Sequence, residues 1–287
     1  YFNNEKEIKN VNFKKSIITH KIIEEMMILA NNCIAKKLSK TKNEIIYRIH
    51  EYPDKIKLKK LRDFFNSLKI NVSKISEFKP LEFNRLVENQ TNYELKKIIN
   101  NFILRSMQQA KYSIKNMGHY GLNLEHYVHF TSPIRRYSDL YIHRILIEDI
   151  SGNSSLNLKK FNLIENICHI TSKTERISSR AERETTERYI AKYMQKKIGE
   201  VFTCYISEIK KNGIWIRLYD IPCESFIPKK NLDYEDLYYD IKSISLKTYS
   251  RRLIFNLGDK LEVQLIESFP LSGNLVFKFL NHEITKN

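Results

Sequence analysis

The spacing of apolar residues changes at Gly199, and this change limits the folds that the chain can adopt. Before Gly199, apolar residues recur every three or four positions over long segments, as in helices that pack on one side. After Gly199 they alternate in short runs, as in half-buried strands. The sequence therefore predicts an α+β protein in which a mainly helical part, residues 1–196, precedes a small all-β domain, residues 197–287.

The helical part has several segments with helical spacing and short strand-like runs between them. Helices are expected over residues 15–40, around 61–68, around 95–110 and over 158–197. In the first helix, the stripe expected to pack against the core consists of Ile22, Ile23, Met26, Met27, Ala30, Cys33 and Ile34. Strand-like runs occupy residues 44–50 and Tyr127 to Phe130, and residues 152–157 (GNSSLN) are typical of a surface loop.

The all-β part contains a strong hairpin signal. Asn212-Gly213 separates two alternating apolar runs, and this residue pair favours a tight hairpin turn. Strand-like runs in this part are EVFTCYISEI, GIWIRLYD, ESFIP, KLEVQLIES and NLVFKFL. Five short strands within one small domain are typical of a closed barrel, and we predict an OB-fold.

The charge of the chain favours a polyanionic partner. Lysine and arginine number 49 against 33 acidic residues, which gives a formal net charge of +16. Each basic side chain that neutralises a phosphate releases counterions, so a basic protein is suited to nucleic acid. The chain is also rich in Lys, Asn and Ile and poor in Gly, and a biased genomic base composition gives the same excess of lysine. Composition alone leaves nucleic-acid binding open.

The four cysteines are scattered, which argues against a zinc knot and against a disulfide framework, and fits a reducing cytosol. They are Cys33, Cys168, Cys204 and Cys223. No stretch approaches the ~18 apolar residues of a membrane span, and the N-terminus YFNNEKEIKN has no signal-peptide pattern. We expect a cytoplasmic protein with no membrane partner.

The segment TSPIRR, residues 131–136, carries the most chemical information. Ser or Thr before proline signals a helix start, so a helix is expected to begin near Pro133. A helix N-terminus presents free backbone N–H groups to anions. Thr131 and Ser132 add hydroxyl groups, and Arg135 and Arg136 add guanidinium groups suited to phosphate.

Asp139 follows one turn later and is placed to brace Arg136, Arg135 or His143. Together with the segment before it, Asp139 forms a site able to hold a phosphodiester. An ordinary capped helix with two surface arginines explains the same residues, so physical chemistry alone leaves both interpretations open.

The longer string HFTSPIRRYSDLYIHRIL, residues 129–146, resembles the signature of the ribonuclease II (RNB) family. ILRSMQQAKYSIKNMGHYGL, IIEEMMILANNCIAKKL and IIYRIHEYPDKIKLKKLRDFFNSL are similar to other segments of that family, in the expected order. The predicted barrel resembles the RNA-binding domain that closes the family's chains. Within the family, the chain is most similar to bacterial ribonuclease R, of which it resembles the C-terminal part.

The resemblance implies 3′–5′ exoribonuclease activity, in which single-stranded RNA is hydrolysed processively to nucleoside 5′-monophosphates at a magnesium site. Arg135, the arginine of the SPIR segment, would be catalytic and would stabilise charge on the scissile phosphate. Beside Arg135, the residues expected to contact RNA are His129, Thr131, Ser132 and Arg136.

Two further RNA contacts are implied outside this segment. Glu175-Arg176 and Arg183-Glu184 resemble the family's ER and RD pairs, and we expect Glu175 and Arg176 to contact RNA. Charges on a long helix are, however, more often a solvated face. Trp215 occupies the aromatic position of the barrel, where stacking on a base contributes roughly 1–3 kcal/mol. A place for Trp215 in the barrel core is equally open.

The sequence departs from the family pattern at several positions. Ser138 stands in place of the usual proline, and helix N-termini tolerate either residue. In the barrel, Asn212 stands in place of the usual aromatic residue, and Ser225 and Pro228 in place of a Gly and a His. These changes put the affinity of the barrel for RNA in doubt more than its fold.

The largest departure concerns Mg²⁺. The family's magnesium ligands are clustered aspartates, which are expected upstream of this chain; the nearest aspartate grouping here is Asp233, Asp236 and Asp240 in the barrel. A hard divalent cation needs converging oxygen ligands, so we expect no metal site in this chain. His119, His126 and His129 lack a nearby fourth ligand for zinc.

Three hypotheses follow. The chain is the C-terminal part of an active exoribonuclease, a non-catalytic RNA-binding remnant of a truncated exoribonuclease, or a basic structural or ribosome-associated protein. Arg135 and the SPIRRY segment favour the first over the third. Single-stranded RNA is the expected partner of a monomeric protein.

Overall fold

The computed structural model describes residues 7–13, 16–41, 43–72, 79–152, 161–232, 234, 236–249 and 254–283. The helical part comprises α1 (Ile18–Leu38), β1 (Tyr47–Ile49), α2 (Lys55–Ser67), α3 (Pro80–Glu88), α4 (Tyr93–Ser106), β2 (Lys111–Ser113), η1 (Tyr120–Leu122), α5 (Tyr137–Ser151), α6 (Phe161–Met194) and η2 (Gln195–Lys197). The β part comprises β3 (Val201–Lys210), β4 (Gly213–Leu218), β5 (Glu224–Pro228), η3 (Lys229–Asn231), β6 (Leu237–Asp240), β7 (Ser245–Thr248), β8 (Ile254–Phe255), β9 (Lys260–Phe269) and β10 (Asn274–Glu283). The predicted α+β fold, with helices first and a β barrel region after them, is confirmed.

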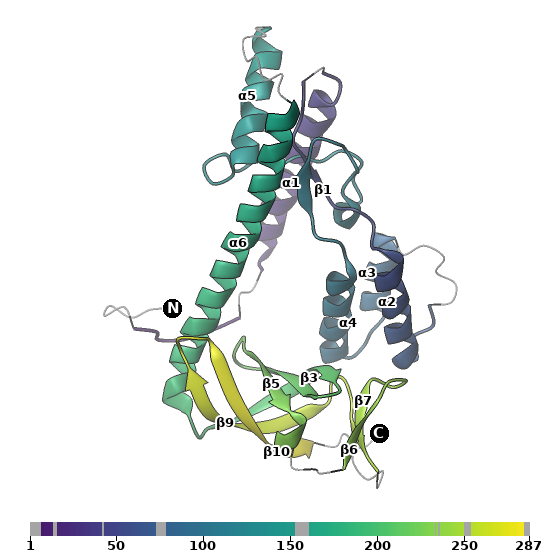
Figure 1. Ribbon diagram of the computed structural model, residues 1–287, viewed down its shortest axis with the longest axis vertical. Coiled ribbons are helices and arrows are strands. Elements are labelled where there is room, and N and C mark those ends of the chain that lie inside the picture. The colour runs from purple at the N-terminus through teal and green to yellow at the C-terminus, as the bar shows by residue number, and fades with distance from the viewer. Residues whose placement is uncertain are drawn as a thin grey trace.

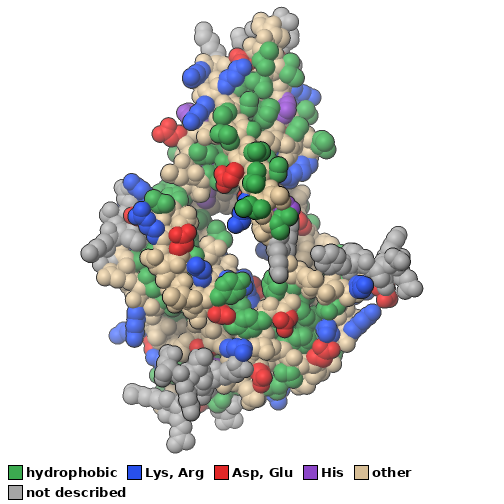
Figure 2. Space-filling view, turned by 180° about the vertical axis from the view of Figure 1, so that it is seen from behind, with side chains coloured by type: hydrophobic (Ala, Val, Ile, Leu, Met, Phe, Trp, Pro, Cys, Tyr) green, Lys and Arg blue, Asp and Glu red, His purple; other side chains and the backbone are tan. Residues whose placement is uncertain are grey.

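The helices and the β part surround an opening (Figures 1 and 2). The long helix α6 runs from the side of α5 to the β part, while α2, α3 and α4 form a separate group above β3 (Figure 1). The elements α1, β1, β2, α5 and the first half of α6 share one hydrophobic cluster, which includes Ala35, Ile46, Ile142 and Ile145. None of the described helices has the length and apolarity needed to cross a membrane.

The three-helix group α2–α4 has its own core. Phe64 and Phe65 on α2 pack with Ile99 on α4 and with Tyr205 on β3, so this cluster ties the group to the β part. The side chain of Asp54 accepts a hydrogen bond from the Lys57 N–H at 2.8 Å and caps α2. Such a cap satisfies one of the N–H groups that have no partner inside the helix.

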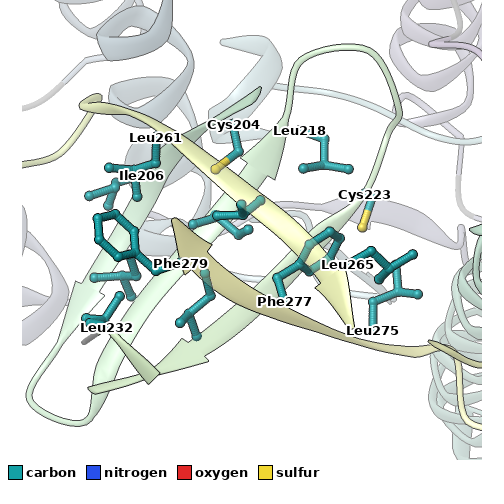
Figure 3. Close-up of a cluster of buried hydrophobic side chains, with 14 of the residues drawn as sticks. Cys204, Ile206, Leu218, Cys223, Leu232, Leu261, Leu265, Leu275, Phe277 and Phe279 are labelled. Carbon is teal, nitrogen blue, oxygen red and sulfur yellow. The ribbon is translucent and has the colours of Figure 1, made fainter. Parts of the chain in front are cut away.

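The β part is a curled antiparallel sheet with the strand order β10-β9-β3-β4-β5. Side chains alternate along the strands, and the inner ones form a continuous core that includes Ile206, Leu261, Leu265 and Phe277 (Figure 3). The two edge strands of this sheet, β5 and β10, lie close together. The Ser225 hydroxyl on β5 donates to the Leu275 carbonyl on β10 at 2.7 Å. All five predicted strands are present, which confirms the period-2 pattern.

The predicted Asn212-Gly213 hairpin is also confirmed, since β3 and β4 pair from Lys210 opposite Gly213 onward. A Cβ atom on Gly213 would lie 2.2 Å from the Ile227 carbonyl oxygen, so β5 packs here against a residue without a side chain. A second, three-stranded sheet, β6-β7-β8, was not predicted. It contributes Leu237, Leu246 and Phe255 to the same core.

Helix α6 connects the two parts physically. Its last turns contribute Ile190, Ala191 and Met194 to the core of the sheet. The Ser268 hydroxyl on β9 donates to the Ala191 carbonyl at 2.6 Å. The C-terminal end of α6 is therefore packed against the five-stranded sheet.

Three local predictions are wrong. The helix expected to begin near Pro133 begins at Tyr137, because Arg136 has extended backbone angles (φ −126°, ψ 120°). The run Tyr127 to Phe130 is extended but forms no strand in the described structure; the Tyr127 carbonyl accepts one hydrogen bond from the Arg48 N–H at 3.0 Å. Of the loop expected at residues 152–157, only Gly152 lies within the described residues.

The third wrong prediction is the packing of α1. The buried residues of α1 are Asn31, Ala35 and Leu38, at its C-terminal end. Ile22, Ile23 and Met26 from the predicted stripe are exposed. Within the described part of the chain, nothing covers these three side chains in the first half of the helix.

Candidate nucleic-acid interface

The residues 131–136, which we call the arginine turn, are held by a buried carboxylate on α5. Asp139 is 0% exposed, and its Oδ1 atom accepts from the Ser132 N–H at 2.8 Å and from Arg136 Nη2 at 2.9 Å. Its Oδ2 atom accepts from the Ser138 hydroxyl at 3.1 Å. Within the turn, the N–H groups of Arg135 and Arg136 donate to the Ser132 carbonyl.

This geometry alters the anion site expected at the helix start. Asp139 is the third residue of α5, so its own negative charge already lies at the positive end of the helix dipole. The predicted brace between Asp139 and Arg136 is confirmed. The Arg135 side chain is not part of this network: it is exposed and forms no hydrogen bond or ion pair with any residue that the structure describes.

A second guanidinium group is fixed nearby from a different element. Arg48, in the middle of β1, donates from Nη1 and Nη2 to the two carboxylate oxygens of Glu175 on α6, at 2.6 and 3.0 Å. The Arg48 side chain is only 12% exposed and also lies 4.8 Å from the centre of the Tyr112 ring. A planar two-point pair of this kind fixes the orientation of both groups.

A cavity of about 500 Å³ opens between α1 and the arginine turn. We call it the histidine cavity, and it is lined by His20, Ile23, Glu24, Met27, Ile28, Asn31, Arg48, Ala110, His119, Leu122, Tyr127, His129, Thr131 and Arg136. The side chain of Asn31 positions one wall, since it donates to the Tyr127 hydroxyl and accepts from the Phe130 N–H, both at 3.0 Å. Tyr127 and Phe130 are thereby held against α1.

Two of the histidines that line this cavity, His119 and His129, are neutral. Burial, followed by the nearby charges of Arg136 and Arg48, lowers the pKa of His129 to about 2. Burial and the neighbouring His50 and Arg48 lower the pKa of His119 to about 4. His129 Nδ1 lies 2.8 Å from the Tyr112 hydroxyl, so a neutral ring can accept that proton. Both rings are therefore polar but uncharged groups at physiological pH.

Two polar atoms at the edge of the cavity are buried without a hydrogen-bond partner among the described residues. They are Thr131 Oγ1 and Arg136 Nε. Leaving a buried donor or acceptor unpaired costs about 1–3 kcal/mol, so such atoms are rare in folded proteins. Both belong to residues that line the histidine cavity.

The structure thus brings together most of the predicted site residues. His129, Thr131 and Arg136 line one cavity, and Ser132 and Arg135 belong to the adjoining turn. Glu175 joins them only through Arg48.

Arg176 does not join them. It lines a different hollow of about 630 Å³ together with Lys111, His169 and Lys173. Successive residues on a helix point about 100° apart, which separates Arg176 from Glu175.

Arg48, Tyr112 and Asn31 were missed from the sequence. Arg48 gave a usable signal, because it is the single charged residue inside the apolar run IIYRI of a buried strand. A charge in such a place needs a partner. The partner itself, 127 positions later, has no local signal.

Trp215 lies far along the chain, on the outer face of the sheet. It is half-buried and lies outside the buried core cluster, whose members on the same strand are Ile214, Ile216 and Leu218. Its ring packs against Phe226 on β5 at 5.4 Å between centres, and Lys210 Nζ lies 5.7 Å from the centre of its ring. Arg217, two positions on, shares this face.

The described residues contain no group of three or more His, Cys, Asp or Glu side chains placed to hold a metal ion. Near the arginine turn, the carboxylates of Asp139 and Glu175 are both engaged by guanidinium groups. The four cysteines are free, and three of them are buried.

The comparisons with known proteins agree with this geometry. The sequence model of the RNB domain matches residues 1–152, which is more than half of the chain and includes β1, the histidine cavity and the arginine turn. The chain belongs to the RNB domain family. The match ends at the last residue of α5 and its glycine cap. The family predicted from the TSPIRR segment is confirmed.

Relatives extend the similarity beyond the RNB match. Ribonuclease R of Aquifex aeolicus is 33% identical over 270 residues, which cover 93% of this chain but 38% of the relative. The chain therefore spans little more than a third of that relative's length. A structure of Mycoplasma genitalium ribonuclease R in complex with ribose-methylated single-stranded RNA is 25% identical, with a TM-score of 0.85 over 97% of this chain and 44% of that one. Yeast Ssd1, described as a pseudonuclease, shares the fold at 18% identity and a TM-score of 0.69, over 82% of this chain and 30% of its own.

Proposed function

We propose that this chain is the RNA-gripping part of a 3′–5′ exoribonuclease that hydrolyses single-stranded RNA processively to nucleoside 5′-monophosphates. The observation that carries the proposal is the pair of buried, unpartnered polar atoms, Thr131 Oγ1 and Arg136 Nε, at a cavity beside the free guanidinium of Arg135. A donor and an acceptor of this kind suit a phosphate oxygen and a ribose hydroxyl. The similarity to ribonuclease R supports RNA as the ligand.

The walls of the histidine cavity suit a nucleotide. The neutral rings of His119 and His129 and the ring of Tyr127 offer flat apolar faces with polar edges. Unstacked bases in RNA-binding proteins commonly stack on such rings. Arg135 and Arg136 supply the positive charge that a phosphodiester requires, with Arg136 fixed by Asp139 and Arg135 free to move toward the ligand. Ser132 holds the turn that carries both arginines.

Magnesium does not fit the carboxylates that the described residues place near the arginine turn. The carboxylates of Asp139 and Glu175 are occupied by Arg136 and Arg48, so they cannot converge on a cation. A hard divalent ion needs several free oxygen ligands. We therefore assign the Mg²⁺ ligands of the proposed reaction to residues outside this chain.

The domain division at residues 196 and 197 belongs to the same proposal. Support comes from the hydrophobic core of the sheet, which is formed almost entirely by residues after that boundary and by the last turns of α6. We propose that the sheet is an OB-fold RNA-binding domain whose outer face, with Trp215 and Phe226, stacks on bases. Free cysteines fit a cytoplasmic protein, and we propose that it acts as a monomer.

The second candidate function is a non-catalytic RNA-binding remnant of a truncated exoribonuclease. It is favoured by the lack of a metal-binding cluster among the described residues, and a pseudonuclease shares this fold. The two candidate functions differ in one respect. Once a metal-binding segment is supplied, the exoribonuclease part should cleave RNA, whereas the remnant should only bind it.

We expect the pure chain to bind single-stranded RNA and not to hydrolyse it. The affinity should fall steeply with salt. For single strands, the logarithm of the association constant declines against the logarithm of the salt concentration with a slope of about −0.7 per phosphate contact. Binding is measured by fluorescence anisotropy at several salt concentrations, and hydrolysis by the release of mononucleotides in magnesium buffer. Steady release by the chain alone would show that a metal site exists within it.

A chimaera separates the two candidates. In it, the matched segment of Aquifex aeolicus ribonuclease R is replaced by this chain. Nuclease activity of the chimaera supports the first candidate. A folded chimaera that binds RNA without cleaving it supports the remnant.

The substitution Thr131→Val tests the cavity itself and should have opposite effects on stability and on binding. Valine has the same shape but removes the unpartnered Oγ1 atom, so the free energy of unfolding of the free chain should rise by about 1 kcal/mol or more. The affinity for RNA should fall about tenfold, since the ligand loses one hydrogen bond. Urea unfolding and anisotropy measure the two effects.

The matched control is Thr171→Val. The Thr171 hydroxyl already donates to the Ile167 carbonyl at 2.7 Å, so its loss brings no gain in stability and no change in RNA affinity. An unchanged RNA affinity of Thr131→Val would exclude the histidine cavity as the RNA site.

A further inference from the structure

The peptide groups on both sides of Thr131 are held by side chains of α5. The His143 ring donates from Nε2 to the Phe130 carbonyl at 2.9 Å, since a carbonyl oxygen only accepts. Asp139, one helical turn earlier on α5, accepts from the Ser132 N–H at 2.8 Å. These two contacts fix the peptide group before Thr131 and the peptide group after it.

A third side chain holds the same segment from α1. Asn31 is buried, and its Oδ1 atom accepts from the Phe130 N–H at 3.0 Å. The N–H and the carbonyl of Phe130 are therefore engaged by two different helices, which share one core at the same end of the molecule (Figure 1). The Phe130 ring also stacks on the His143 ring, with 4.0 Å between centres and 8° between planes. We call Asn31, Asp139 and His143 the threonine frame.

The threonine frame explains why the Thr131 hydroxyl is unpaired. A threonine hydroxyl can bond to a nearby backbone carbonyl, as those of Thr171 and Thr186 do on α6. Thr131 Oγ1 is buried and has no hydrogen-bond partner among the described residues. A small shift of the backbone would let the hydroxyl find a partner and would remove the cost of an unpaired buried group. The frame opposes that shift.

His143 affects the histidine cavity only indirectly. Thr131 lines that cavity and His143 does not. Among the described residues, the hydrogen bond and the ring contact of His143 both go to Phe130. Asp139, in contrast, is also the counter-charge of Arg136. His143 is therefore the member of the frame whose effect on the cavity can be measured without disturbing an ion pair.

We propose that His143 and Asn31 are positioning residues of the RNA site, which hold Thr131 so that its hydroxyl stays unpaired until RNA binds. This inference rests on the proposed function for the identity of the ligand. A polar group that is fixed before the ligand arrives needs no ordering on binding, so it contributes more to affinity than a mobile one. The frame itself can be tested without RNA.

The first test is a double-mutant cycle between Thr131→Val and His143→Phe, followed by urea unfolding of the RNA-free chain. Phenylalanine keeps a ring that can stack on Phe130 but removes the donor to the Phe130 carbonyl. In the unsubstituted chain, Thr131→Val should raise the urea midpoint, because it removes the unpaired hydroxyl. In the His143→Phe background the rise should disappear, because the released hydroxyl finds a partner. An equal change of midpoint in both backgrounds would overturn the proposal.

The second test is the same cycle with RNA affinity as the measurement. His143→Phe alone should weaken RNA binding by about three- to tenfold, within the loss expected for the hydroxyl itself. In the Thr131→Val background it should weaken binding by less than about twofold, because the group that it positions is already gone. His143→Gln should restore binding, since its Nε2 lies about as far along the side chain and can donate to the same carbonyl.

The matched control is His169→Phe, at an exposed position of α6 that does not line the histidine cavity. It should change neither RNA affinity nor its coupling to Thr131→Val. A residue with a merely structural role would lower the urea midpoint in the same way as His143→Phe but would show no coupling to Thr131→Val in RNA affinity. Equal losses of RNA affinity from His143→Phe in both backgrounds would therefore overturn the proposal.

Asn31→Leu tests the frame from α1 and takes the place of His143→Phe where that variant does not fold. Leucine has a similar volume and releases both the Phe130 N–H and the Tyr127 hydroxyl. Its loss of RNA affinity should be smaller in the Thr131→Val background than in the unsubstituted chain, and equal losses would contradict the proposal. If the urea midpoints couple as expected but no variant changes RNA affinity, the frame holds and the RNA site of the proposed function is wrong.

Discussion

We expect Asp139→Ala to lower the free energy of unfolding by about 3–5 kcal/mol, the largest effect of any single substitution near the arginine turn. The carboxylate is fully buried and accepts from Ser132 N, Arg136 Nη2 and the Ser138 hydroxyl. Alanine leaves a buried guanidinium without its counter-charge and a buried N–H group without an acceptor. Urea unfolding followed by circular dichroism measures the loss.

Two further variants identify the cause. Asp139→Asn keeps the shape and an acceptor oxygen for Ser132, so its loss should be smaller, about 1–3 kcal/mol. Asp149→Ala, on the same helix, breaks a surface pair with Lys37 at 3.4 Å and should cost less than about 1 kcal/mol. Equal losses for Asp139→Ala and Asp149→Ala would show that Asp139 does not hold the turn.

Asp139 also shows what the sequence does and does not reveal. The pairing of Asp139 with Arg136 could be predicted, since residues three apart on a helix are neighbours. Its hydrogen bond to the Ser132 N–H could not, because it depends on a turn that the chain makes before the helix begins. The Ser-Pro signal placed the helix start at Pro133, four residues too early, for the same reason.

Elements with a strong local pattern were predicted well. The helix around residues 95–110 is α4, and the long helix expected over 158–197 is α6. Both have enough turns for the apolar period to stand out. Strands β6, β7 and β8 have two to four residues each, too few for a period-2 pattern, and their pairing was missed.

The exposed face of α1 marks a second limit. Periodicity identifies an amphipathic helix, but it does not say which surface covers the apolar side. Figure 2 shows hydrophobic side chains gathered on the face above the opening, and Ile22, Ile23 and Met26 are exposed. The candidate site has the same limit. The arginine turn is one contiguous segment and was found, whereas the pair between Arg48 and Glu175 joins residues 127 positions apart.

The second large effect concerns Arg135, measured in the chimaera that supplies the metal-binding segment. Arg135→Ala should lower the rate of single-turnover cleavage by about 10²–10³-fold. Its RNA affinity should fall by about tenfold or less. The Arg135 side chain has no hydrogen-bond or ion-pair partner among the described residues, so its guanidinium is free to follow the phosphate as charge develops on it. An interaction that strengthens in the transition state acts on the rate more than on binding.

Two further variants distinguish the contributions of the Arg135 charge, of its two-point hydrogen bonding, and of simple RNA binding. Arg135→Lys should restore only part of the rate, because an ammonium keeps the charge but cannot form two parallel hydrogen bonds. Trp215→Ala should do the reverse of Arg135→Ala. Its ring lies on the outer face of the sheet against Phe226, so its loss should weaken binding of longer RNA and leave cleavage of an engaged end unchanged.

The comparison of Arg135 with Arg136 carries the argument further. Arg136 is held by a fully buried carboxylate, so part of its charge is already compensated before RNA arrives. Arg135 lies one residue earlier in the same turn and is not compensated by any described residue. An unpaired charge keeps its full interaction with a developing negative charge, whereas a charge that is already paired has lost part of it. If Arg135→Ala raised the dissociation constant and left single-turnover cleavage unchanged, Arg135 would be a tether for RNA, and the charge that stabilises the transition state would have to come from Arg136 or from outside this chain.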